Sequence, residues 1–252
     1  MVAGSLVGLA LVAGPARAAE VKVLAAGAVR DVVKELADGY AKATGVEVDV
    51  SFGAMGPLKA SIGAGARADV VILTPVVFTE LIESGKLGVK RRAAVGRVGV
   101  GVAVRTGVVH PDIATTAAFR NALLATPVLI YGNPKVTSSG AYFAKLIDNM
   151  GLADALRAKT MMFADGHEVM TNLGRSEGVA IGVTQISEIL SNLAMGVDLV
   201  GPLPLELQNY TVYEAAVLSN APSPSEADAF FDRLVDKPAQ ARFGAMGFEA
   251  VR

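Results

Sequence analysis

The sequence has 252 residues, of which 52% are hydrophobic, and a formal net charge of −1 at pH 7. This length supplies enough apolar material for one large domain or two small ones. The near-neutral charge and the lack of a basic run argue against nucleic acid as a partner. The absence of cysteine excludes disulfides, thiol catalysis and thiolate metal sites. With His110 and His167 as the only histidines, no multi-histidine metal site is expected.

The N-terminus has the pattern of a secretory signal peptide. A short apolar stretch, residues 1–14, is followed by Pro15 and by the A-x-A cleavage pattern of residues 16–18. No Lys or Arg precedes the apolar stretch, which a start site placed too far downstream would explain. The alternative, a buried N-terminal helix, is disfavoured by the glycines at positions 4, 8 and 14. We therefore predict a signal peptide over residues 1–18 and a periplasmic mature protein.

From residue 21 the chain alternates short apolar runs with amphipathic segments. This alternation predicts βα units and a mostly parallel sheet with helices on its faces. The first set has strands at 21–26, 46–52 and 69–74, with helices at about 33–45, 58–62 and 78–84. A longer alternating strand, 97–104, is a candidate crossover to a second lobe.

A second α/β set follows this crossover. The pattern predicts helices at 112–124, 141–150, 168–173 and 186–195, and strands at 128–131, 160–163, 179–183 and 198–200. A strand at 211–218 is a candidate return to the first lobe, followed by a helix capped at Ser225 and a last helix at 238–245.

Two loops of the first set follow strands and precede helices, where ligands bind in open α/β sheets. The first contains Ala28, Val29 and Arg30, whose amides and guanidinium suit an oxyanion. Alternatively, it is a tight turn with Arg30 solvated or paired with Asp31. The second contains Ala54 and Met55 between two glycines, which either admit a ligand close to the backbone or simply make a turn.

The second set offers further candidates. Ser138 and Ser139 follow Thr137 at the start of a helix, and this run of hydroxyls exceeds what N-capping requires. His167 precedes another helix. It is either a ligand contact or an ordinary structural histidine. Gln185 follows a strand together with Thr184. No nucleophile elbow, Walker loop, dinucleotide fingerprint or metal-ligand spacing is present.

The whole chain after the signal segment resembles the periplasmic molybdate-binding protein family, receptors of ABC importers with a type II two-lobed fold. The resemblance is carried by VKVLAAGAVRDVVKELADGYAKATGVEVDVSFG, the ADV of residues 68–70, GNPKVTSSGAYFAKLIDNMGL, VAIGVTQISEI and FFDRLVDKPAQARFGAMGF. It implies a receptor that needs no cofactor or metal, acts as a monomer and delivers a small anion to a membrane permease.

The ligand positions depart from the family's molybdate pattern. The family's two serines fall on Ala28 and on Ala54 or Met55, and its alanine falls on Ser139. An aliphatic residue falls near His167, and a tyrosine falls on Gln185. A site with Arg30, Ser139, His167 and Gln185 suits an organic carboxylate better than a symmetric tetrahedral dianion.

Certain exported bacterial aconitate isomerases also resemble this receptor family, so an enzyme is the alternative. In that case His167, with Glu168 beside it, would move the proton. No catalytic residue is expected for a receptor. For either function we predict one lobe of residues 19–104 plus 211–252, a second lobe of residues 105–210, and crossovers near 101–105 and 202–210. The ligand would lie in the cleft between the lobes.

Overall fold

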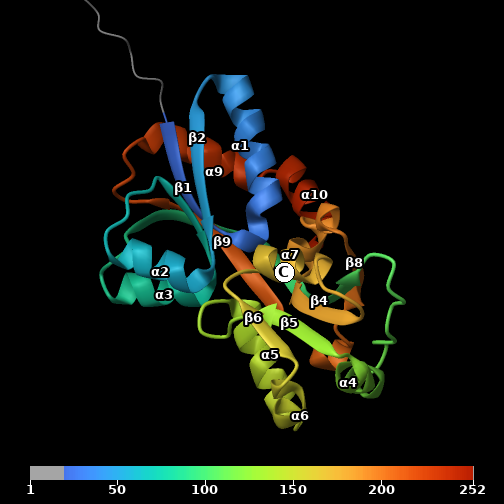
Figure 1. Ribbon diagram of the computed structural model, residues 1–252. Coiled ribbons are helices and arrows are strands. Elements are labelled where there is room, and N and C mark those ends of the chain that lie inside the picture. The colour runs from blue at the N-terminus through green and yellow to red at the C-terminus, as the bar shows by residue number, and fades with distance from the viewer. Residues whose placement is uncertain (1–19, 252) are drawn as a thin grey trace, which may run out of the picture.

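The computed structural model describes residues 20–251. The predicted signal peptide, residues 1–18, lies outside the described residues. Within the described part of the chain, no helix is long and apolar enough to cross a membrane. The chain forms two α/β lobes joined by long strands, as the sequence predicted (Figure 1).

The first lobe is built on a mixed sheet in the order β2-β1-β3-β9-β4. Its N-terminal elements are β1 (Glu20–Ala26), α1 (Arg30–Thr44), β2 (Glu47–Gly53), α2 (Met55–Gly63), β3 (Val70–Leu73) and α3 (Pro75–Glu83). Its C-terminal elements are β9 (Tyr210–Leu218), α9 (Pro224–Val235), α10 (Lys237–Ala245) and β10 (Phe248–Glu249). β1 pairs in parallel with β2 and β3, whereas β9 runs antiparallel to β3 and β4.

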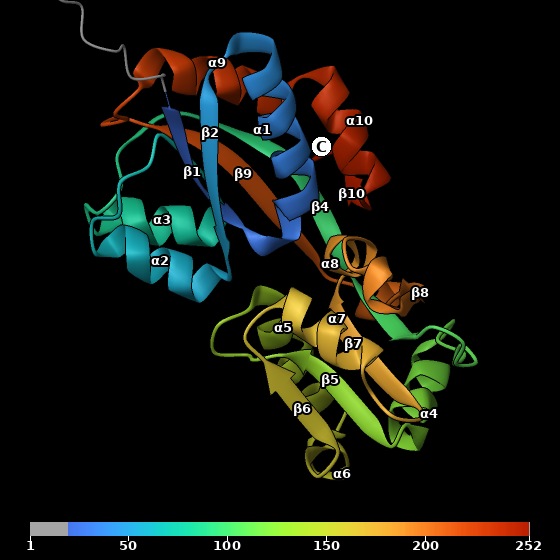
Figure 2. The same cartoon turned by 45° about the horizontal axis from the view of Figure 1, so that its top comes forward.

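The second lobe continues the sheet from β4 in the order β7-β5-β6, with β8 also on β4. Its elements are α4 (Thr116–Ala125), β5 (Val128–Gly132), α5 (Ser138–Asn149), α6 (Ala153–Arg157), β6 (Thr160–Phe163), α7 (Gly166–Gly174), β7 (Ala180–Gln185), α8 (Ile186–Leu190) and β8 (Val197–Pro202). Its buried side chains form two clusters, and the first lobe has its own cluster, to which β1, β3, β9 and α9 contribute. Figure 2 shows α8 between the two lobes.

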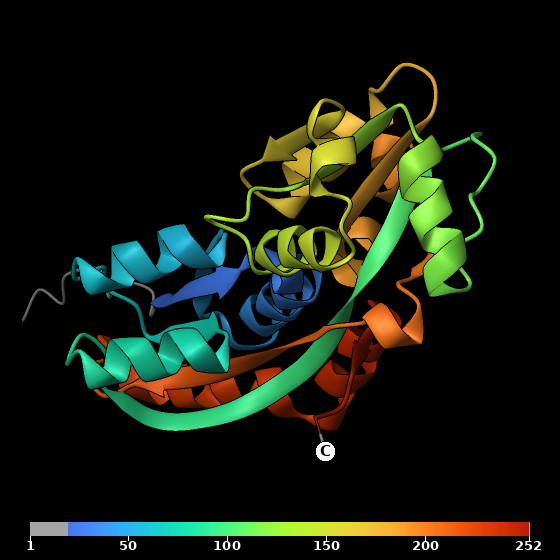
Figure 3. The same ribbon diagram turned by 90° about the horizontal axis from the view of Figure 1, so that it is seen from below.

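The strand β4 (Val89–Arg105) connects the lobes and is longer than predicted. Figure 3 shows it as one curved strand running from one lobe to the other. Gly99 pairs with Tyr210 of β9 and Val100 pairs with Gln185 of β7, so the change of partners comes just before the segment 101–105. The first eight residues of β4 escaped prediction because they include Lys90, Arg91 and Arg92, whose charges find carboxylate partners only in the folded protein.

Three predicted helix starts or ends were wrong. Helix α4 starts at Thr116 and not at 112, because Thr115 caps it while the Asp112 side chain accepts the Ala114 N–H in a local turn. Helix α9 has Ser223 as N-cap and not Ser225, since Pro224 occupies the first helical turn. The helix predicted over 186–195 ends at Leu190, followed by a 3₁₀ turn, Leu193–Met195, that ends at Gly196 with φ +79°.

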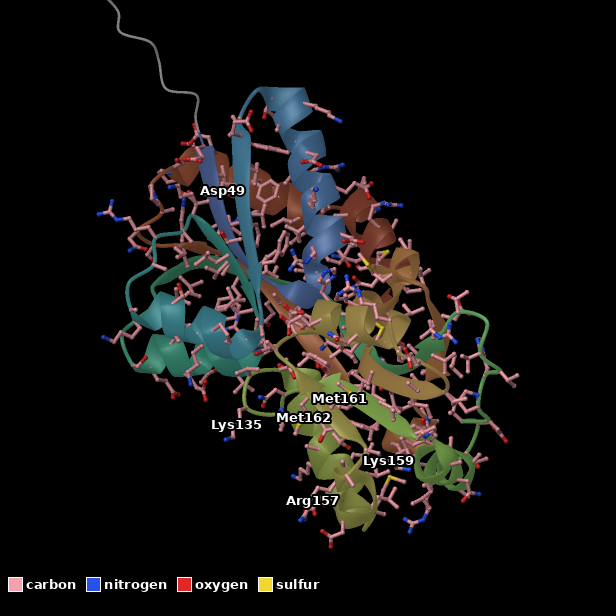
Figure 4. The ribbon with its side chains drawn as sticks, in the orientation of Figure 1. Asp49, Lys135, Arg157, Lys159, Met161 and Met162 are labelled. Carbon is pink, nitrogen blue, oxygen red and sulfur yellow. The ribbon has the colours of Figure 1, made fainter. Side chains whose placement is uncertain are left out.

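One buried carboxylate anchors the first lobe. Asp69 is fully buried and accepts the backbone N–H groups of Lys22 at 2.8 Å and Ser223 at 2.6 Å. We expect Asp69→Ala to lower the free energy of unfolding by about 3 kcal/mol, because two partly buried backbone donors lose their carboxylate acceptor. Urea denaturation measures this. Asp49→Ala on the exposed face of β2 (Figure 4) is the control and should change stability by less than about 0.5 kcal/mol. Equal stability of the two variants would contradict the role of Asp69 in stabilising the first lobe.

Candidate functional site

A cavity lies where strand ends and helix starts of the two lobes meet. From the first lobe it is lined by Ala26, Gly27, Ala28, Arg30, Gly53, Ala54, Met55 and Tyr213. From the second lobe it is lined by Thr137, Ser138, Ser139, Asp165, Gly166, His167, Gln185, Glu188, Ser191 and Asn192. The parallel pairing of β1 with β2, and of β5 with β7, brings these loops to facing edges.

Most predicted ligand contacts line this one cavity. They are Ala28, Arg30, Ala54, Met55, Ser138, Ser139, His167 and Gln185. Val29 does not line it, because its side chain is fully buried in the first lobe's core. Thr184 also points elsewhere, with its hydroxyl buried between Ser139, at 3.5 Å, and the Glu188 carboxyl.

The lobes touch on two sides of the cavity. The Gly56 N–H at the start of α2 donates to the Val136 carbonyl of the second lobe at 3.2 Å. The Tyr213 hydroxyl of β9 donates to Gln185 Oε1 at 2.9 Å, and both side chains are buried. A Cβ on Gly56 would lie 3.3 Å from Val136, so glycine permits this close approach. The structure therefore has the lobes in contact around the cavity.

The Gln185 amide leaves one donor unused. Because Oε1 accepts from Tyr213, Nε2 is the group left over, and it is buried without a hydrogen-bond partner in the described structure. Burial, together with the nearby Glu188, raises the pKa of Tyr213, so its hydroxyl stays protonated and remains the donor. An unpaired buried N–H costs about 1–3 kcal/mol, which indicates a place for a ligand acceptor.

Arg30 brings a positive charge to the cavity. Its guanidinium stacks on the Phe52 ring at 4.7 Å from the ring centroid, which fixes the side chain beside the cavity. No Asp or Glu of residues 20–251 forms an ion pair with it, and the pairing with Asp31 considered from the sequence does not occur. The guanidinium is thus available to an anion.

His167 is held in one orientation by Asn192. Asn192 Nδ2 donates to the Glu188 backbone carbonyl at 2.7 Å, so Oδ1 is the atom 2.5 Å from His167 Nδ1. An amide oxygen only accepts, and Nδ1 must therefore carry the proton. This leaves His167 Nε2 as the ring nitrogen free to accept a proton.

The glutamate that lines the cavity is Glu188 and not Glu168, and Asp165 lines it as well. Glu168 lies at the exposed start of α7, where its carboxylate accepts the Ala164 N–H at 3.0 Å and its own N–H donates to the N-cap side chain of Asp165 at 2.8 Å. Glu188 Oε2 accepts from the Thr184 hydroxyl and, at 3.4 Å, from the Gln185 N–H. Burial is the main cause that raises the pKa of Glu188 and Asp165 adds to it, against opposing contributions from these hydrogen bonds and Arg30.

Sequence reasoning missed Glu188, Asn192 and Tyr213. They lie 3, 7 and 28 residues beyond Gln185, and no loop motif connects them. Only the helical turn that returns Glu188 to the strand end, and the pairing of β9 with β4, bring them to the site. Among residues 20–251, no group of three or more His, Cys, Asp and Glu side chains is placed to hold a metal.

Residues 21–249 match the model of a family described as bacterial extracellular solute-binding protein. The chain belongs to this family. An aconitate isomerase from a Pseudomonas species is 29% identical to this solute-binding protein over 235 residues, 91% of this chain and 87% of that protein. The molybdate-binding protein ModA of Escherichia coli K12 is 26% identical over 241 residues, 94% and 92% of the two chains.

A solved structure, the periplasmic molybdate-binding protein of Azotobacter vinelandii, superposes on the solute-binding protein with a TM-score of 0.74. The superposition covers 92% of this chain and 100% of that one, at 19% identity. At this identity the likeness concerns the fold alone. It confirms the predicted two-lobed fold and the predicted resemblance to molybdate-binding proteins.

Proposed function

We propose that the solute-binding protein binds a small organic polycarboxylate in the cavity between its lobes. The observation that carries this is the unpaired, buried Gln185 Nε2 in the same cavity as the Arg30 guanidinium, which has no carboxylate partner within the described chain. A cation and an unpaired hydrogen-bond donor in one cavity favour the binding of an anion that accepts hydrogen bonds.

The shape of the donor set favours carboxylates over a tetrahedral oxyanion. The second lobe contributes polar side chains, among them the Ser139 hydroxyl and the His167 imidazole, and Arg30 adds a planar fork from the first lobe. The loops after β1 and β2 contribute Ala28, Ala54 and Met55, which lack side-chain donors. An anion with a carbon skeleton has both an apolar and a polar face, whereas molybdate and sulfate need donors all round.

The proposal extends to location and partner. The pattern of residues 1–18 supports export to the periplasm, as does the family's description as extracellular. Closure of two lobes around a ligand is a hinge motion, and a membrane permease of an ABC importer would recognise the closed form. Such a receptor would work as a monomer.

Thermal-shift measurements on residues 19–252 test the ligand class. The ligands are trans-aconitate, citrate and succinate, with molybdate, tungstate and sulfate as the inorganic comparison. A ligand at 100 times its Kd stabilises the folded state by about 2.7 kcal/mol, so we expect a clear rise in melting temperature with the tricarboxylates. A rise with molybdate at micromolar concentration and none with any carboxylate would refute the proposal.

A second candidate is isomerisation of aconitate in the same cavity. The observation that favours it is His167 Nε2, which Asn192 leaves free to take a proton. Moving the double bond of a tricarboxylate requires removal of a proton at one carbon and delivery at another. The similarity to the Pseudomonas aconitate isomerase supports the same candidate.

A further inference from the structure

The Glu188 carboxyl occupies a position where the two lobes meet. Gly27 precedes α1 of the first lobe and Gly166 starts α7 of the second, and a Cβ on either would point toward this carboxyl. A Cβ on Gly27 would lie 3.6 Å from Glu188 Oε1, and a Cβ on Gly166 would clash with the carboxyl group. Gly166 thus leaves room for the Glu188 carboxyl, and Gly27 lies next to it across the lobe boundary.

The two oxygens of Glu188 have different surroundings. Oε2 is occupied by the Thr184 hydroxyl and the Gln185 N–H. No side-chain hydrogen bond within residues 20–251 involves Oε1, and Glu188 lines the cavity. Although the residue is half-buried overall, its carboxyl is deeply enclosed by protein atoms. Oε1 is therefore the atom that a ligand can reach.

Several ionisable groups lie near Glu188, but none of those in the described chain forms an ion pair with its carboxyl group. Arg30 from the first lobe attracts a negative charge there, and Asp165 at the start of α7 repels one. His167 on α7 and Tyr213 on β9 are the other ionisable groups that line the cavity. From β4, β7 and β8, which also pack near α8, no ionisable side chain lines it. No Lys, Arg or His of the described chain forms an ion pair with Glu188.

We infer that Glu188 binds the ligand as a neutral acid, donating its Oε1–H to a ligand carboxylate, so that binding takes up a proton. The inference rests on the proposed function, that the ligand is a polycarboxylate. An ionised Glu188 would repel the incoming anion, and a protonated one supplies a short charge-assisted hydrogen bond. Glu188 thereby selects a ligand with three acceptor groups. One accepts from Arg30, one from Gln185 and the third from Glu188.

The sign of the pH dependence follows from linkage. A bound anion next to Glu188 raises its pKa above the value in the free protein. Affinity is then full below the pKa of the free protein and falls as pH rises through the pKa of the complex. The fall approaches tenfold per pH unit within that interval, where each binding event takes up close to one proton.

Titration calorimetry with trans-aconitate in buffers of different ionisation enthalpy counts the protons taken up. Since His167 can also take up a proton, the comparison is made between His167→Gln and the double variant His167→Gln with Glu188→Gln. We expect proton uptake to persist in the single variant, with affinity falling at least tenfold as pH rises across the interval in which uptake is measured. In the double variant, uptake should vanish and affinity should become independent of pH.

Equal uptake in the two variants, or none in His167→Gln at any pH, would overturn the role of Glu188. If Glu188→Gln impairs folding, difference infrared spectroscopy of the native complex decides. A protonated carboxyl band that shifts on trans-aconitate binding supports the inference, and its absence contradicts it. Failure of the proposed function is distinct, because then the native protein shows neither binding heat nor thermal shift with any carboxylate.

Discussion

Arg30→Gln is expected to weaken trans-aconitate binding by about one to two orders of magnitude. The guanidinium is the only cation among the described residues lining the cavity, apart from any charge on His167, and a hydrogen bond between charged groups contributes about 1.5–3 kcal/mol. At about 1.4 kcal/mol per tenfold, this corresponds to a factor of roughly 10–150 in Kd. Titration calorimetry of the purified variant measures it.

The matched control is Arg157→Gln on α6, which does not line the cavity and has a well-exposed side chain (Figure 4). Its Kd should equal that of the native protein. Arg30→Lys separates charge from geometry, because lysine keeps the charge but loses the planar fork and the stacking on Phe52. Unchanged affinity in Arg30→Gln would remove Arg30 from the site and with it the main argument for a carboxylate.

His167→Gln is expected to abolish isomerisation while retaining measurable binding, if the second candidate function is correct. General acid–base catalysis by one positioned group contributes about 10²–10⁴-fold. The assay is NMR of trans-aconitate in deuterated buffer, which reports both the double-bond shift and deuterium incorporation. The loss should be at least a hundredfold, since the orientation that Asn192 gives the ring has no counterpart in glutamine.

His110→Gln is the control for this experiment. His110 lies outside the cavity near Asp198, at 3.8 Å, and the variant should retain full activity. Turnover by His167→Gln at the native rate would exclude His167 as the acid–base group. Native protein that neither isomerises trans-aconitate nor incorporates deuterium would leave binding as the function of this cleft.

The two-lobed fold was predictable because its signals are local. Periodicity places a buried strand or an amphipathic helix within a few residues, and the order of these elements specifies parallel units in each lobe. Elements that depend on distant partners were harder to predict. The first part of β4 carries Arg91 and Arg92, and it becomes a strand only through its pairing with β9, where carboxylates on α9 and β9 meet these charges.

The candidate ligand residues were predictable to the extent that they lie next to strand ends. Ser139, His167 and Gln185 stand at helix starts that the sequence marks with small and polar residues. Val29 lies between Ala28 and Arg30, which line the cavity, and yet faces the core, because successive side chains of a 3₁₀ turn point about 120° apart. Glu168 and Glu188 could not be told apart as the cavity's acid from sequence alone.

What the sequence by itself determined is the class of molecule: two α/β lobes, a family resemblance, and loops rich in potential donors. Only the tertiary structure decided which donors are unpaired and which are satisfied. Gln185 keeps a buried Nε2 without a partner because the Tyr213 hydroxyl, from the opposite lobe, donates to its Oε1. His167 gained a free Nε2 through Asn192, and Glu188 lies in the cavity between two glycines that are far apart in sequence. Hydrogen-bond satisfaction and burial depend on contacts between distant segments, and a linear pattern does not contain them.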